Sequence, residues 1–540
     1  MKKRLKSYFI IIFCMIFLFS SQMLMEVRAD AIWDNMKLAN EMVKEKNYDE
    51  AVKSWLNLVE LYENQPEKMN WTNYAMYLEK IGDYYAGNFN GGAINRPLAV
   101  QYYDKSHLAY QNTDLNWGVV QTKNKADQLR TVIRVFVEKT VETNTIKAKQ
   151  DHYIPVNGAY IGIYGEFDER LTTWGYVDPD KIKETFNKSH SMILTYATYG
   201  KSQLPKQLTS NIKESGGALQ VAMEPSAGLE QVKDDTYIRQ WASDAKEAGI
   251  PIFLRFGGEM NGNWVEWGLQ PELYIEKFQL VHDIMAEEAP NVVMLWSPND
   301  IPYDNYEAYY PGDDYVDWVG VSSYAVPDGN AHTDLSNYDM NPLNKLQHIY
   351  SAYGDRKPIM ISEGAVAYWA KVSPERNFDA WYQNNMERIY HYLPRLYPNI
   401  KAINYFDTNE DHDHYRLDHI NANSVYNEVI NQPYYLSKVG QESSVKFDEL
   451  MDTQVIDKEP MTLSTYAGIY DPFINRVEYY INGTLFKTAT KMPYNATIDF
   501  TNFNQDDVQL IIKVYDSQDQ LAGEREIQFT FVDATTSATP

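Results

Sequence analysis

Short apolar, β-rich runs alternate with segments of helical periodicity across residues 153–435. In residues 235–249 and 271–290, apolar side chains recur every three or four positions, which predicts helices between the runs. Eight such runs with intervening helices are typical of a (β/α)8 TIM barrel. The predicted strands cover residues 158–164, 191–198, 218–224, 251–259, 291–298, 317–324, 358–364 and 400–407.

A doubly wound α/β sheet would give the same alternation of strands and helices. Such a sheet favours a glycine-rich phosphate-binding loop after its first strand. The sequence GAYIGIYGEFDER, which contains the first predicted strand and its loop, supplies no such motif. We therefore predict the closed barrel.

The segment before the barrel, residues 31–150, has helical periodicity and predicts an all-α domain. Ala51 and Trp55 share one helical face, and Ala99 and Tyr103 have the same relative positions in a second segment. The two segments resemble tetratricopeptide-like helical hairpins. A generic helical bundle is the alternative.

Two features complete this helical region. A Gly/Asn-rich insertion, residues 86–97, interrupts the second hairpin. A long helix over residues 119–146 is predicted to lead into the barrel.

Alternating strand patterns return after the barrel, in residues 446–535. The runs 476–483 and 507–516 have a period of two, and Asn482-Gly483 is a strong hairpin signal. This region resembles bacterial immunoglobulin-like modules. The chain is therefore predicted to be a multidomain protein with a central barrel, an N-terminal all-α helical-repeat domain and a C-terminal all-β immunoglobulin-like sandwich.

The first 29 residues have the pattern of a secretory signal peptide. A basic start precedes an apolar run over residues 8–20, and Val27-Arg28-Ala29 suits cleavage. An uncleaved membrane anchor is the alternative. We expect a secreted or cell-surface protein exported in the Gram-positive manner. The basic residues at the start are Lys2, Lys3, Arg4 and Lys6.

The cysteine count and the net charge exclude several classes of function. The single cysteine, Cys14, lies in the predicted signal peptide, so neither a disulfide framework nor a cysteine metal site is expected. The chain has 49 Lys and Arg against 74 Asp and Glu, a net charge of −25. Without residues 1–29, which hold five basic residues and one acidic residue, the charge becomes −29. This balance argues against nucleic acid as a partner.

Two glutamates end predicted strands, Glu259 on the fourth and Glu363 on the seventh. Because chemistry in such barrels lies at the carboxyl ends of the strands, both are predicted to point into the barrel mouth. Glycosidic bond hydrolysis needs two carboxyl groups, one protonated and one ionised. Arg255 would keep the second ionised. Salt-bridged surface glutamates are the alternative.

Strand periodicity makes this prediction more specific. The fourth predicted strand would bring Arg255, Gly257 and Glu259 to one face. On the seventh, Ile359, Ile361 and Glu363 would share a face.

Three motifs resemble glycoside hydrolase family 26, which comprises retaining β-mannanases and relatives that act on β-1,3/1,4-glucans and xylans. They are RFGGEMNGNWVEWG (255–268), YYPGDDYVDWVGVSSY (309–324) and PIMISEGA (358–365). The resemblance covers residues 155–415 or thereabouts. It implies a secreted retaining endo-hydrolase that cleaves a β-linked polysaccharide by double displacement without a cofactor.

The resemblance also assigns roles to residues of the barrel. It implies that Glu259 is the acid/base, Glu363 the nucleophile, and Tyr324 a hydrogen-bond donor to the nucleophile. Glu224 is either a subsite residue or a hydrogen-bonded structural carboxylate. The residues expected to bind substrate are Trp264, Trp267, Asn261, Trp296, Glu224 and Phe406.

One departure from the family pattern supports a rival interpretation. Mannanases of this family usually carry His immediately before the acid/base, where this chain has Gly258. A weakly active or inactive carbohydrate-binding protein that assists cell-surface polysaccharide assembly is therefore the alternative. In either case we expect a monomer that binds polysaccharide, and the helical repeats offer a surface to a protein partner.

A short charged run, Asp411-His412-Asp413-His414, contains residue types that bind metals. A charged loop after the eighth strand is the simpler interpretation. We predict no metal site.

Overall fold

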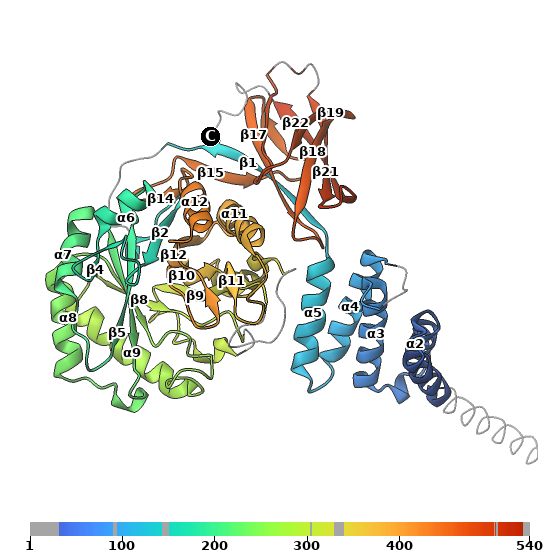
Figure 1. The fold of residues 1–540 in the computed structure, drawn as a ribbon, viewed down its shortest axis with the longest axis horizontal. Helices are drawn as coiled ribbons and strands as arrows, with labels where there is room; N and C mark the ends of the chain where they lie inside the picture. Colours follow the sequence, from blue (N-terminus) through green and yellow to red (C-terminus); the bar gives the residue numbers. More distant parts are fainter. Residues whose placement is uncertain are drawn as a thin grey trace, which may run out of the picture. The chain divides into compact units, whose positions relative to one another are not determined.

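The computed structural model describes residues 32–89, 94–142, 151–302, 305–328, 340–501, 503 and 506–532 (Figure 1). The predicted signal peptide therefore lies outside the described residues. The chain forms two compact units, Met1–Val132 with Gly468–Tyr470, and Ile133–Ala467 with Asp471–Pro540. Across the described ranges, no helix combines the length and the apolar character that a bilayer crossing requires.

The first unit consists of helices, as the sequence predicted. A helix over residues 32–44 precedes α2 (Tyr48–Glu63), α3 (Trp71–Ala86), α4 (Arg96–Tyr110) and α5 (Asn116–Leu129), with a short 3₁₀ turn, η1, at Pro66–Lys68. Asparagine side chains accept hydrogen bonds from backbone N–H groups at the starts of α2, α3 and α4. Such N-caps satisfy donors that have no partner within the helix.

Corresponding positions of the two predicted hairpins are buried in this unit. Ala51 and Trp55 on α2, and Ala99 and Tyr103 on α4, are all almost completely inaccessible. Gly82 on α3 permits the close approach of α4, because a Cβ there would lie 2.6 Å from the Tyr103 ring. The alanine and the aromatic residue four positions after it are therefore buried in both segments.

The long helix predicted over residues 119–146 is wrong. Helix α5 ends at Leu129, and strand β1 (Val132–Thr140) follows after two residues. The run VIRVFVE is rich in β-branched residues, which favours a strand, and its residues 135–137 are all buried. Strand β1 joins a sheet with strands from the far end of the chain, in the order β15-β1-β17-β20. The predicted helical domain therefore ends in a strand of the C-terminal region.

All eight predicted barrel strands are present, and they form a closed parallel barrel (Figure 1). Pairing of β12 with β2 closes the sheet and excludes the doubly wound alternative. A short ninth strand, β14 (Tyr435–Leu436), extends the sheet beside β2. The barrel strands are β2 (Ala159–Tyr164), β5 (Met192–Thr198), β6 (Ala218–Glu224), β7 (Ile252–Phe256), β8 (Val292–Trp296), β9 (Trp318–Ala325), β10 (Ile359–Val366) and β12 (Ile400–Phe406).

Helices surround the barrel strands (Figure 1). Short strands and 3₁₀ turns lie in the connecting loops. The helices are α6 (Pro179–Phe186), α7 (Lys206–Ser215), α8 (Thr236–Ala248), α9 (Pro271–Glu288), α10 (Leu346–Tyr353), α11 (Asp379–Leu396) and α12 (Ile420–Ile430). The loop strands pair as β3 (Thr172–Thr173) with β4 (Tyr176–Val177), and β11 (Trp369–Ala370) with β13 (Asp413–His414). The 3₁₀ turns are η2 (Asp151–Tyr153), η3 (Leu229–Gln231), η4 (Tyr306–Tyr309) and η5 (Pro342–Lys345).

The barrel interior changes from apolar to polar along its axis. One buried cluster includes Met192, Phe253, Trp318 and Met360, each from a different strand. Further along the strands, Asn404 donates a hydrogen bond to Gln220 at 2.6 Å, and Gln220 donates to the Ser362 carbonyl at 2.9 Å. Because buried polar groups are costly unless paired, this bonded layer fixes the strands just below the mouth.

The C-terminal region contains two sheets, of four and five strands. Asn482 and Gly483 both have positive φ, at 47° and 79°, which confirms the predicted hairpin between β18 and β19. Arg395 of barrel helix α11 donates to Ser464 at 2.8 Å, so this region bonds directly to the barrel. Its strands are β15 (Val445–Glu449), β16 (Val455–Asp457), β17 (Pro460–Gly468), β18 (Ile474–Ile481), β19 (Thr484–Ala489), β20 (Ala496–Asp499), β21 (Asp507–Asp516) and β22 (Leu521–Val532).

The position of β1 inside the four-stranded sheet gives a testable prediction. Val135 of β1 is fully buried, whereas Val132 at the start of the strand is 37% exposed. We expect Val135→Asp to lower the free energy of unfolding by about 4 kcal/mol, because an unpaired charge would be buried, and Val132→Asp to change it by less than about 1 kcal/mol. Denaturant titration measures both. Equal effects would contradict the assignment of β1 to this core.

Candidate active site

A tight turn after β7 brings Glu259 towards Arg255. Strand β7 ends at Phe256, and Gly257 and Glu259 have φ values of 53° and 60°. The prediction that an extended strand places Arg255 and Glu259 on one face is therefore wrong in its geometry. The Glu259 N–H donates to the Ser297 carbonyl at 2.8 Å, which ties the turn to the end of β8. Positive φ in a residue other than glycine is a strain often found at functional sites.

Steric crowding explains why position 258 of this turn is a glycine. A Cβ at this position would lie 2.5 Å from Nε of Arg255 and 2.7 Å from its Cζ. Real Cβ atoms do not approach other atoms so closely. The guanidinium therefore occupies the space that a side chain at position 258 would enter.

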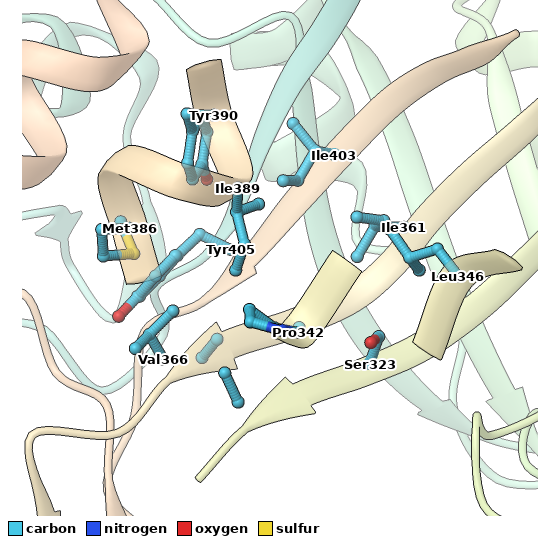
Figure 2. Close-up of a pocket in the computed structure, with 13 residues that line it drawn as sticks. Ser323, Pro342, Leu346, Ile361, Val366, Met386, Ile389, Tyr390, Ile403 and Tyr405 are labelled. Atoms are coloured by element: carbon cyan, nitrogen blue, oxygen red, sulfur yellow. The ribbon is translucent and has the colours of Figure 1, made fainter. Parts of the chain in front are cut away.

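A β-bulge turns Glu363 into the barrel mouth. The register of β10 against β9 shifts between Ile361 and Glu363. Ser362 faces the interior, where its Oγ lies 2.7 Å from Oγ of Ser297. Ile361 faces outward and lines an apolar cavity of about 30 Å³ between the barrel and α11 (Figure 2). The prediction that Ile361 and Glu363 share a face is therefore wrong, because the bulge inserts a residue between them.

Three donors surround the Glu363 carboxylate, which is only 7% exposed. Its Oε2 accepts from Arg255 Nη1 and from the Tyr196 hydroxyl, each at 2.5 Å. Its Oε1 accepts from the Tyr324 hydroxyl at 2.6 Å. Burial and the charge of Glu363 raise the pKa values of both tyrosines well above their usual range, so both hydroxyls remain donors.

The Arg255 side chain is the only cation that bonds Glu363 among the described residues, and it is 3% exposed. It also donates from Nε to Ser297 at 3.1 Å and from Nη2 to Ser322 at 2.6 Å. Burial alone would lower its pKa, but the charges of Glu363 and Glu259 raise the pKa above its usual value. The guanidinium is thus a permanent, fixed positive charge.

Glu259 lies on the other side of this cation, in a more open environment. Its Oε1 is 3.7 Å from Nη2 of Arg255 and accepts from Nδ2 of Asn299 at 3.0 Å. Its Oε2 accepts from Nε1 of Trp264 at 2.8 Å. Glu259 from the turn after β7 and Glu363 from β10 therefore meet at one guanidinium, as a two-carboxylate site requires.

Three residues predicted to bind substrate are buried and hold the site in place. Trp296 is fully buried and donates to the Tyr309 carbonyl at 3.1 Å, on the side of the barrel that faces the helices. Trp267 donates to the Gly258 carbonyl at 2.8 Å. Asn261 bonds the Asn299 N–H and the Pro302 carbonyl. Their contact with substrate stays a prediction, because in this structure all three are buried and bonded within the fold.

Of the remaining three predicted binding residues, Trp264 donates to Glu259, and Phe406 and Glu224 lie at the ends of their strands. The Phe406 ring stacks on Tyr164, with centroids 5.0 Å apart, and meets the Tyr324 ring edge-on at 5.9 Å. Glu224 is half-buried, and burial raises the pKa of its carboxyl, an effect that Arg255 opposes. Phe406 is therefore mostly covered by its aromatic neighbours, and a contact of either residue with sugar stays a prediction.

The charged run after β12 does not assemble a metal site. His414 stacks on Trp369 with centroids 4.2 Å apart, and burial raises the pKa of Asp413 to about 6. Within the part of the chain that the structure describes, no three ligand-type side chains gather closely enough to hold an ion. Tyr415, just beyond this run, packs 5.3 Å from Tyr324 and supports the mouth.

Three polar residues of the site were not predicted from the sequence: the donors Tyr196 and Asn299, and the acceptor Ser322. Strand periodicity contained a signal for Tyr196, because it lies four residues after the inward-facing Met192. Asn299 and Ser322 carried no comparable signal. Their roles depend on how neighbouring loops meet.

Comparisons with known proteins agree with this geometry. Residues 227–397 match the family model described as "Glycosyl hydrolase family 26". This match covers the central part of the barrel, from η3 into α11. The matched segment contains both glutamates, Arg255 and Tyr324.

Curated relatives resemble only part of this chain. "Endoglucanase H" of Acetivibrio thermocellus is 32% identical over 128 residues, which are 21% of this chain and 14% of that protein. "Mannan endo-1,4-beta-mannosidase A and B" of Caldalkalibacillus mannanilyticus is 32% identical over 100 residues, 16% of this chain and 19% of that protein. The chain thus spans less than a fifth of the length of these relatives. A solved modular endo-β-1,4-mannanase from Cellulomonas fimi is 14% identical, with a TM-score of 0.40, over 69% of this chain and 94% of that one.

A buried pair of carboxyls lies where β12 pairs with β2 and closes the barrel. Asp407 follows β12, Asp168 follows β2, and the two buried carboxyls are close enough for each to shift the pKa of the other. Oδ1 of Asp407 accepts from the Leu417 N–H at 2.6 Å, but no N–H or O–H group described here reaches Oδ2. Burial and the Asp168 charge raise the pKa of Asp407 to about 8, whereas Arg170 lowers the pKa of Asp168 against the effect of burial. Asp407 is therefore the protonated partner.

The turn after β7 is predicted to tolerate no side chain at position 258. Gly258→Ala should displace the guanidinium of Arg255 and weaken the buried pair with Glu363. We expect the free energy of unfolding to fall by about 3 kcal/mol, as measured by denaturant titration. Gly228→Ala, where only a φ of 93° opposes the new Cβ, should cost about 1 kcal/mol. Equal losses would contradict the role assigned to the close contact.

Protonation of Asp407 predicts a dependence of stability on pH. Its folded pKa of about 8 exceeds the ordinary 3.8, so its contribution is complete below pH 3.8 and is lost as the pH rises towards 8. Asp407→Asn keeps a neutral donor without this titration. We expect the Tm of the variant relative to wild type to increase between pH 4 and pH 8 and then to level off. A constant Tm difference across this range would refute the protonation of Asp407.

Proposed function

We propose that this chain is a retaining endo-glycoside hydrolase that cleaves a β-linked polysaccharide by double displacement. One observation carries the proposal. Glu363 and Glu259 approach the same buried guanidinium, at 2.5 Å and 3.7 Å, and Glu363 also accepts two tyrosine hydrogen bonds. Retaining enzymes place their two carboxyl groups about 5–5.5 Å apart on either side of the glycosidic bond.

Glu363 is the nucleophile in this proposal. Its Oε2 accepts two hydrogen bonds and its Oε1 only one, so Oε1 keeps more free electron density. Oε1 attacks the anomeric carbon, and the bond from that carbon to the leaving oxygen breaks. Arg255 keeps the carboxylate ionised before the attack.

Glu259 is the acid and then the base. It first donates its proton to the leaving oxygen, which departs as a hydroxyl group. It then accepts a proton from water, and the water oxygen forms the new bond to the anomeric carbon as Glu363 Oε1 is released. Its partial exposure and its bonds to Trp264 and Asn299 hold it at the open side of the mouth.

The substrate class follows from chemistry and from similarity. The Trp264 ring and the carboxylates of Glu259 and Glu363 lie together at the barrel mouth, which suits a polymer of neutral hydroxylated rings. The names of the relatives include a mannan endo-1,4-beta-mannosidase and an endoglucanase. Mannan, mixed-linkage β-glucan, xylan and a bacterial exopolysaccharide are therefore the polymers to test.

Export and partners are part of the same proposal. The basic and apolar pattern of residues 1–29 supports secretion, where extracellular or cell-surface polysaccharide would be met. We infer a monomer that binds polysaccharide through the barrel, with the helical unit available to a protein partner.

The glycine at position 258 was the reason for the alternative hypothesis, in which the barrel binds carbohydrate without hydrolysing it. The close contact with Arg255 weakens that argument, because it gives the missing side chain a structural reason within an otherwise complete site. The rival remains the alternative outcome of the experiment.

The experiment is a reducing-end assay on β-1,4-mannan, glucomannan, mixed-linkage β-glucan and xylan. We expect the wild type to release reducing ends from at least one polymer, and Glu363→Gln and Glu259→Gln to lose at least about 10³-fold in kcat. Glu266→Gln, an exposed glutamate of the same loop, is the matched control and should retain full activity.

The rival predicts a different result in the same assay. Equal reducing-end signals from the wild type and Glu363→Gln, with polymer binding retained, would contradict the proposed hydrolysis and favour a binding protein.

A further inference from the structure

The loop after β2 carries a small hairpin with an unusual tip. Strands β3 and β4 pair antiparallel, and Trp174 and Gly175 form the two-residue connection between them. Their φ values of 54° and 83° are both positive, as a type I′ turn requires. The loop belongs to the carboxyl ends of the barrel strands, the same end as Glu259 and Glu363.

Trp174 is costly at this position for two reasons. A bulky residue at positive φ is strained, and asparagine or aspartate normally takes this place in the turn. The side chain is also 95% exposed, so its large apolar surface stabilises nothing in the fold. Neither cost is explained by packing, so the ring points to a ligand.

The base of the hairpin is firmly held, so the ring is presented on a rigid arm. Leu171 before β3 and Val177 in β4 are buried. The Asp178 N–H donates to the Leu171 carbonyl at 2.8 Å, and the Thr173 hydroxyl donates to the Asp178 carboxylate at 2.7 Å. A ring that needs no ordering on binding loses little conformational entropy.

The same loop is continuous with the catalytic mouth through aromatic contacts. Phe167, which is 63% exposed, meets the Tyr164 ring edge-on at 6.0 Å. Tyr164 stacks on Phe406, and Phe406 contacts Tyr324, the donor to Glu363. A chain of packed aromatic rings therefore connects the donor to the nucleophile with Phe167, an exposed residue of the loop that carries Trp174.

We propose that Trp174 is a carbohydrate platform that stacks on a sugar unit of the bound polysaccharide at a distance from the bond that is cut. The C–H face of a pyranose ring is apolar, and it packs on an indole while the hydroxyl groups at its rim stay in water. The inference rests on the proposed function, and it adds that the chain prefers long polymers to short oligosaccharides.

The Trp174→Asn variant distinguishes the effect of the indole ring from the effect of the hairpin backbone. Asn-Gly is the favoured pair for a type I′ turn, so this variant keeps the hairpin and removes only the aromatic surface. We expect an equal or higher Tm, about tenfold weaker retention in gels that contain the polymer, and unchanged kcat/KM on an aryl trisaccharide. Trp174→Phe should keep most of the retention.

Retention in gels with mannan, glucomannan, mixed-linkage glucan or xylan does not need catalysis. The experiment can therefore refute the hydrolase proposal and the Trp174 proposal independently of each other. If no polymer is cleaved but the wild type is retained more strongly than Trp174→Asn, the platform stands and the hydrolase proposal falls. If both proteins cleave and bind a polymer equally, the platform is refuted. Equal losses on the polymer and the aryl trisaccharide would also refute it, as would a change confined to self-association on size exclusion.

Discussion

The buried guanidinium of Arg255 is the interaction on which the site depends. A cation at this depth is costly to desolvate unless it is paired and hydrogen-bonded. It is paired with Glu363 at 2.5 Å, faces Glu259 at 3.7 Å, and donates to Ser297 and Ser322. Removing either glutamate would leave the charge partly uncompensated, so the pair of carboxylates and the arginine constrain one another.

The surrounding fold is shaped to this charge. The turn after β7 places Gly258 where the guanidinium leaves no room for a side chain, and the bulge in β10 rotates Glu363 from the wall into the mouth. Below them, the Asn404, Gln220 and Ser362 layer fixes the strands against shear. Local strain in the turn and the bulge is tolerated because this bonded layer and the closed sheet hold both ends.

The periodic parts of the chain were predictable and the irregular parts were not. All eight strands followed from short apolar runs, because a parallel barrel buries both faces of each strand. The strand β1 was missed because its β-branched run follows directly on a helix and pairs with residues more than 300 positions away. The turn at Glu259 and the bulge at Glu363 break periodicity, so the sequence identified the two glutamates but not how they reach the mouth. Trp296 and Trp267 show the same limit, because aromatic residues in a site motif also serve as its packing.

The central claim is that Glu363, held ionised by Arg255, forms a covalent bond to the sugar and is displaced by water from the same face that the leaving group occupied. The configuration of the first product tests this claim most directly. Proton NMR during early hydrolysis of a β-linked polymer should detect new reducing ends first as the β anomer, with the α anomer appearing only through mutarotation. First appearance of the α anomer would mean that water attacks the sugar directly, and would contradict this account of the site.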